Sequence, residues 1–164
     1  MATIDYFLKI AGLEGESADE MHRGEIEVQS FNWGETQSGT IRPGGGGRPG
    51  VSKVEPRDFV FVKKLDKSSP ALFISCATGE HFTNAVLAAR KAGGGQQDYL
   101  TVTMDDLLIS SYQVMGVAEA GSVPSDQIAL SFAKLRMSYK PQKSDGSFSG
   151  EVTEKYDFVA NRKV

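Results

Sequence analysis

Apolar residues in this chain fall mostly in short runs that alternate with polar residues, and Gly, Pro, Ser and Asp bound the runs. A period of two is typical of β-strands, because successive strand side chains point to opposite faces. Ile4, Tyr6, Leu8 and Ile10 predict a first strand that ends at Gly12. Further strands are expected within 26–33, 59–62, 100–109, 128–139 and 156–160. The pattern therefore predicts a mainly β fold.

Two of these strands change the face of their apolar residues partway along. Ile26 and Val28 share one parity, whereas Phe31 and Trp33 share the other. A similar change separates 128–132 from 135–139. One extra residue moves all later side chains to the other face, so we expect β-bulges near 29–30 and near 133–134. Such bulges suit a curved sheet or a closed barrel.

Only one segment is clearly helical. Ser69 is expected to cap it, Pro70 suits its first turn, and Gly79 can adopt the left-handed conformation that ends it. Its expected apolar face consists of Leu72, Phe73, Cys76 and Ala77. Periodicity in the next segment, 82–92, leans towards a helix but also suits a strand.

Two loops are long enough to be important, 34–53 and 118–125. Long loops without regular structure are usually functional or mobile. The first contains four consecutive glycines, 44–47, and residues 45–50 match G-x-G-x-x-G. That motif binds nucleotides only between a strand and a helix, and no helical pattern follows here. A phosphate-binding loop of the Walker type is excluded too, because Val51 follows Gly50 where lysine is needed.

Composition and charge exclude several classes of protein. The chain has 164 residues, of which 40% are hydrophobic, so we expect one domain with one core. The net charge of −3 gives no general attraction to nucleic acid or anionic lipid, and neither is expected as a partner. No apolar run of 18 residues occurs, and Asp5 stands where a signal peptide would be basic. We therefore expect neither membrane insertion nor a signal peptide.

No catalytic arrangement emerges from the chemically active residues. Cys76 is the only cysteine, which rules out an internal disulfide, and we expect it to be a small buried apolar residue. His22 and His81 lack metal-ligand spacing and are expected at the surface or in loops. Asp105 and Asp106 would diverge on a strand, so they predict a bend rather than an acid–base pair. The expectation is a protein without catalytic residues, metal or cofactor.

Several stretches resemble one known family in order along nearly the whole chain. They are IDYFLKIAGLEGES, EIEVQSFNWGETQSG, FVFVKKLDKSSPALFISCATGEHF, RKAGGGQQDYLTVTMDDLLISSY and LSFAKLRMSYKPQKSDG. The most specific pieces lie at 31–39, 65–70 and 139–146, because a generic β-fold does not require them. These stretches resemble the Hcp (haemolysin-coregulated protein) family, the tube subunits of bacterial type VI secretion systems.

The resemblance implies a single domain over 1–164, a closed or nearly closed β-barrel of two sheets with one short helix alongside. It implies that 82–92 is a strand, and we expect no C-terminal effector domain. Hexameric rings of such subunits would stack into a tube inside a contractile sheath, with the spike protein and effector proteins as partners. The protein would be made in the bacterial cytoplasm and expelled to the extracellular space or a target cell.

Two other functions stay open from the residues. One is the tail tube of a phage or phage-like contractile particle, and the other is a monomeric barrel that binds a small ligand. For the assembly function, we expect the loop 34–53 to contact an adjacent subunit or ring. The residues of this expected contact are Gly34, Glu35, Gln37, Ser38, Arg42, Gly44, Gly45, Gly46, Gly47, Arg48 and Lys53.

Overall fold

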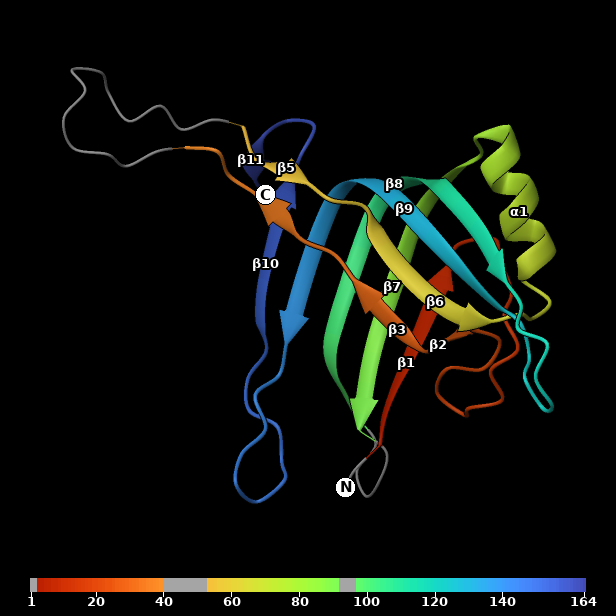
Figure 1. Ribbon diagram of the computed structural model, residues 1–164. Coiled ribbons are helices and arrows are strands. Elements are labelled where there is room, and N and C mark those ends of the chain that lie inside the picture. Colours follow the sequence, from red (N-terminus) through yellow and green to blue (C-terminus); the bar gives the residue numbers. More distant parts are fainter. Residues whose placement is uncertain (1–2, 40–52, 92–96) are drawn as a thin grey trace.

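The computed structural model describes residues 3–39, 53–91 and 97–164 of the chain (Figure 1). These residues form eleven strands and one helix. In chain order they are β1 (Ile4–Ile10), β2 (Ile26–Val28), β3 (Ser30–Asn32), β4 (Glu35–Thr36), β5 (Glu55–Pro56), β6 (Phe59–Lys64), α1 (Ser69–Thr78), β7 (His81–Lys91), β8 (Asp98–Met115), β9 (Ser125–Tyr139), β10 (Val152–Asp157) and β11 (Arg162–Lys163). The mainly β prediction is confirmed, and 81–91 is a strand.

Nine strands form one antiparallel sheet that forks at β9. Its main order is β11-β10-β9-β8-β7-β1-β2. Along 125–130, β9 pairs with β6, and along 134–139 it pairs with β10. The other edge of β6 pairs with β3, while β4 and β5 form a separate two-stranded ribbon. One bent sheet therefore supplies both walls around the core.

Of the expected closed or nearly closed β-barrel, the closed form is wrong, because the ladder of hydrogen bonds does not close. Within the described residues, β2 pairs with β1 alone and β3 pairs with β6 alone. The chain itself crosses between these two edges at Gln29, whose N–H donates to the Val62 carbonyl at 2.8 Å. In a closed barrel the edges β2 and β3 would be paired with each other. Here the backbone passes from one edge to the other instead.

Three neighbouring strands, β7, β8 and β9, each switch the side on which their residues are buried, and they do so at positions that pair with one another. The buried residues on either side of the change are Phe82 and Ala85 in β7, Met104 and Leu107 in β8, and Phe132 and Leu135 in β9. The β8–β9 register is nevertheless constant, since Asp105 faces Lys134 and Leu107 faces Phe132. Asp106 lies between them with a φ of 52°. We call this level, residues 83–84, 105–106 and 133–134, the crease.

The crease corrects the expected bulge near 133–134. All three strands change face together, so none gains a residue relative to its neighbour, and the β8–β9 register shift lies instead between Ile109 and Ser111. The irregularity near 29–30 is present, but it separates β2 from β3, which pair with different strands. The predicted bend at Asp105 and Asp106 is confirmed.

The helix α1 ends at Gly79 as predicted, with a φ of 69°, but its start and its face differ. Ser68 occupies the N-cap position, so Ser69 is helical and does not cap. The buried face consists of Ser69, Leu72 and Ser75, while Phe73 and Ala77 are exposed. Cys76 is only partly buried.

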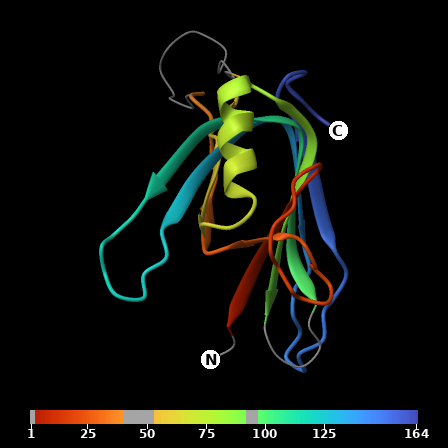
Figure 2. The same cartoon turned by 90° about the vertical axis from the view of Figure 1, so that its right-hand side faces the viewer.

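The core lies inside the bent sheet. Among its fully buried side chains are Leu8, Phe59, Phe61, Leu87, Met104 and Leu130. Tyr6, Phe31 and Phe59 form a run of ring contacts across it, with centroids 5.0 Å and 5.6 Å apart. In the described part of the chain, no helix is long and apolar enough to cross a membrane. Figure 2 shows α1 beside the β8–β9 hairpin, which projects from the body.

Candidate assembly surfaces

A two-stranded arm extends from the sheet at the predicted loop. Glu35 pairs with Pro56 and Thr36 with Glu55, and the Arg57 N–H donates to the Gly34 carbonyl at 2.7 Å. We call residues 34–39 and 53–57 the arm. Figure 1 shows it projecting past β10 and β11, near the C-terminus.

The structure places part of the predicted contact loop in this arm. Glu35, Gln37, Ser38 and Lys53 are exposed on it, and Gly34 lies at its base. Six other residues of the prediction lie outside the described residues. They are Arg42, Gly44, Gly45, Gly46, Gly47 and Arg48. The described part of the predicted loop therefore lies on or beside the paired strands β4 and β5.

An apolar groove of about 640 Å³ lies next to the arm. It is lined by Trp33, Glu35, Leu135, Met137, Tyr139, Val152, Glu154, Lys155, Tyr156, Phe158 and Lys163. Three cross-strand pairs of this lining lie on one face of the sheet: Tyr139 faces Val152, Met137 faces Glu154, and Leu135 faces Tyr156. Leu135 is buried, whereas Tyr139 and Val152 are exposed. The inner face of the sheet thus continues beyond the core as an uncovered apolar surface, which we call the groove.

The β8–β9 hairpin ends in a second exposed apolar surface. All residues from 113 to 124 are exposed. Its large apolar side chains are Val114, Met115, Val117 and Val123. Figure 2 shows this end of the hairpin standing clear of the sheet. We call residues 113–124 the tip; it contains the predicted loop 118–125, except for Ser125, which begins β9.

A buried polar cluster holds α1 against β6 and β9. The Lys63 ammonium lies 3.0 Å from both Asp66 Oδ1 and Asp126 Oδ2, and it donates to Ser69 Oγ at 2.8 Å. Asp66 also accepts from the Ser68 N–H at 2.8 Å and from the Ser68 hydroxyl. The stretch 65–70, one of those that carry the resemblance noted above, therefore fastens the start of the helix to the sheet.

Tyr112 completes this cluster from β8. Its hydroxyl donates to Asp126 Oδ2 at 3.0 Å. Burial, followed by the contact with the Asp126 carboxylate, raises the pKa of Tyr112 to about 12. The phenol is therefore neutral at physiological pH and acts as a donor that helps to satisfy a buried carboxylate.

Residues 11–25 cover the outer face of β1 and β7, and we call them the strap. His22 is buried there: its ring stacks on Phe7 with centroids 4.5 Å apart. Its Nδ1 lies 2.8 Å from Glu25 Oε2 and its Nε2 lies 3.0 Å from Asp98 Oδ1. The prediction that His22 lies at the surface or in a loop is confirmed by its loop position, although its side chain is buried. His81 is exposed, as expected.

Arg90 fastens the strap from the sheet side. It pairs with Asp19 of the strap, and its guanidinium carbon lies 5.1 Å from the centroid of Phe7. The hydrogen bond from Arg90 holds the pKa of Asp19 below its ordinary value. Sequence analysis did not identify this contact, because the two residues are 71 positions apart.

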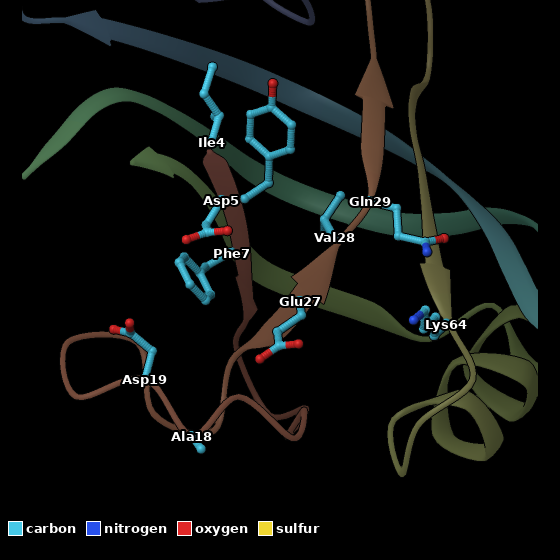
Figure 3. A pocket seen from close by; sticks show the side chains of 10 residues that line it. Ile4, Asp5, Phe7, Ala18, Asp19, Glu27, Val28, Gln29 and Lys64 are labelled. Atoms are coloured by element: carbon cyan, nitrogen blue, oxygen red, sulfur yellow. The ribbon is translucent and has the colours of Figure 1, made fainter. Parts of the chain in front are cut away.

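A hollow of about 510 Å³ opens between β1, the strap and β2 (Figure 3). The Asp5, Asp19 and Glu27 side chains lie around it, with Lys64 at its edge. Asp19 already pairs with Arg90. Throughout the described residues, no group of three or more His, Cys, Asp or Glu is arranged to hold a metal ion.

These features define a structural β-protein whose exposed apolar and hairpin surfaces suit contacts with other chains. Comparison with known proteins supports this class, because the similar proteins are Hcp proteins and a type VI secretion system effector. Protein hcp1 of Pseudomonas aeruginosa is 40% identical over 148 residues, which are 90% of each chain. The crystal structure of Hcp1 from Salmonella typhimurium has 35% identity and a TM-score of 0.81, and it covers all of both chains. A type VI secretion system effector from Yersinia pestis has 33% identity and a TM-score of 0.74, over 93% of this chain and 99% of that one.

Residues 7–139 match the family described as "Type VI secretion system effector, Hcp". The chain therefore belongs to the Hcp family of type VI secretion proteins. It is a secreted tube subunit, which acts as a structural component and not as an enzyme.

Proposed function

We propose that this chain forms hexameric rings that stack into the inner tube of a type VI secretion system. Contraction of the surrounding sheath would drive the tube, the spike protein and effector proteins out of the cell. The observation that carries this proposal is full-length agreement in fold with Hcp1 of Salmonella typhimurium, at 35% identity. The chain also has two different exposed apolar surfaces, the tip and the groove, which supports a head-to-tail contact between copies. Such contacts form a closed ring when the rotation from one copy to the next adds up to a full turn.

The ring part of the proposal predicts the mass of the purified protein. Light scattering should give a particle of six chains, each of 17.7 kDa. Negative-stain electron microscopy of the same sample should show rings with a central opening. A monomer at every concentration tested would contradict the proposal and would favour the ligand-binding alternative.

The arm provides the test of stacking. We propose that the loop 34–53, whose described flanks form the arm, contacts an adjacent subunit or ring. Deleting Gly44–Gly47 should reduce ring formation or stacking in electron micrographs, whereas replacing the same four glycines by serine keeps the length and should reduce it less. Normal rings and stacks from the deletion variant would refute a contact role for this segment.

Export can be tested in the producing bacterium. The protein should accumulate in the medium of cells with a working sheath and remain inside cells whose sheath cannot contract. Effector binding is tested by recovering effector proteins with the purified rings. Release that does not depend on the sheath would contradict the proposed route.

A further inference from the structure

The chain carries two exposed apolar surfaces that no residue of the same chain covers within the described structure. The tip projects from one side of the molecule, and β10, which lines the groove, lies on the other side in both views (Figures 1 and 2). They are connected by β9, which begins at Ser125, next to the tip, and ends in the groove at Tyr139. At about 3.3 Å per residue the strand between them is roughly 45 Å long. The tip therefore cannot reach the groove of its own chain.

We propose that the tip of one copy of this chain docks into the groove of the next copy. This inference rests on the proposed ring function and assigns the surfaces that make one of its contacts. The two surfaces differ, so the contact is head-to-tail and leaves one tip and one groove free at the ends of any open chain of copies.

The residue types on both surfaces suit a contact with another copy of this chain. The groove presents Trp33, Met137, Tyr139 and Tyr156, and interfaces are enriched in Trp, Tyr and Met. The tip carries one charge between Val114 and Val123, which is Glu119. Interface centres are depleted of charge in this way. The charged groove residues are Glu35, Glu154, Lys155 and Lys163, a balanced set.

Three of these four groove charges are already paired within the chain. Lys163 lies 2.8 Å from Glu154, and Lys155 lies 3.2 Å from Asp105. The groove therefore has no strong net charge that would recruit an acidic or basic partner. An apolar surface from a second copy fits it better, and the contact should persist at high salt.

The size of the tip fits one part of a ring contact. A specific interface uses about 20–30 residues on each side. The tip supplies the twelve consecutive exposed residues 113–124. It therefore accounts for about half of such a surface, and the neighbouring arm borders the groove through Glu35.

The test changes one surface at a time. Val117 is 62% exposed on the tip and Val152 is 60% exposed in the groove, so Val117→Asp and Val152→Asp should both fold. A carboxylate at either buried contact should weaken association at least about 100-fold, which leaves monomers in light scattering. Ile74→Asp on α1 is the matched control, since Ile74 is 52% exposed and lies outside both surfaces. It should assemble like the wild type.

Mixing the two variants gives the decisive result. The V152D copy retains an intact tip and the V117D copy retains an intact groove, so the mixture should form dimers of one copy of each and nothing larger. Two monomeric variants that do not pair when mixed would refute docking of tip into groove. Variants that keep the wild-type mass would refute the contact while the ring proposal stands. A wild-type protein that is itself monomeric would overturn the ring proposal and the contact together.

Discussion

Lys63 of β6 and Asp126 of β9 form an ion pair, with Nζ 3.0 Å from Oδ2, in which both side chains are fully buried. The two residues are also direct partners in the β6–β9 ladder. Their pair lies where the forked sheet meets α1; its ammonium also donates to Ser69 Oγ, and its carboxylate accepts from the Tyr112 hydroxyl. Such a pair is stable only while all its members are present, because an isolated charge in the protein interior is costly.

Replacing Lys63 by Met should destabilise the protein by about 3–5 kcal/mol, because it leaves the Asp126 carboxylate buried without its cation. Urea unfolding followed by tryptophan fluorescence measures this change. The control is Lys67→Met, since the exposed Lys67–Glu14 pair should contribute about 0–1 kcal/mol. The double variant Lys63→Met, Asp126→Leu should lose less than the sum of its single changes. Equal losses for Lys63→Met and Lys67→Met would contradict the role of the buried pair.

The Arg90–Asp19 contact should make the strap sensitive to acid. The pKa of Asp19 is lowered in the folded state, so its contribution to stability is present above its ordinary value of 3.8 and is lost as the pH falls through the lower folded value. Asp19→Asn should therefore reduce stability at pH 7 and flatten its dependence below about pH 5. Denaturant unfolding at a series of pH values measures both effects.

Glu20→Gln removes the same charge from an exposed neighbour in the strap and is the control for that prediction. It should leave stability at pH 7 close to that of the wild type. Parallel stability curves for Asp19→Asn and the wild type over the whole acid range would show that the Arg90 contact contributes nothing.

Gly15 should not tolerate a side chain. A Cβ at this position would lie 2.3 Å from the Glu25 carbonyl oxygen, and that backbone belongs to the other end of the strap. Gly15→Ala should therefore lower stability by roughly 1–3 kcal/mol. Gly150→Ala, where no atom lies within 4 Å of the added carbon, should change it little. Thermal unfolding of both variants tests the prediction, and an unchanged midpoint for Gly15→Ala would refute the close approach.

Asp106 should be replaceable by glycine but not by valine. Its φ of 52° lies in the left-handed region, which is costly for a β-branched residue by about 1–2 kcal/mol and free for glycine. Asp106→Val should therefore lower the unfolding midpoint, while Asp106→Gly should hold or raise it. A Val variant as stable as the Gly variant would mean that the crease does not require this conformation.

Alternation of apolar residues located most strands, because period-two burial depends on neighbours in the sequence. The same period of two also indicates that Lys63 is buried, because it follows Phe59 and Phe61 on the odd-numbered, buried side of β6. The nature of its partners could not be predicted, since Asp126 lies 63 positions away. The helical face was misassigned for a similar reason. Ser69 is buried in the polar cluster, Ser75 is buried with its hydroxyl donating to Glu80, and Phe73 is exposed.

The assembly surfaces were only partly predictable. The long loop was identified by its length and its glycines, and its flanks form the arm. The groove was not identified, because it combines Trp33 with residues of β9 and β10 that are more than a hundred positions away. The tip shows no distinctive motif; its importance follows from exposure of valines and methionine that alternation alone would assign to a core.

The continuity of β8 and β9 through the crease has a mechanical consequence. Each strand runs from the tip into the inner face of the sheet as one unbroken covalent backbone. A pulling force applied between the two ends of β9 is carried by peptide bonds, and it loads the flanking hydrogen bonds together in shear rather than one after another. The subunit should therefore resist stretching in this direction far better than peeling of β2 or β11 from the sheet edges.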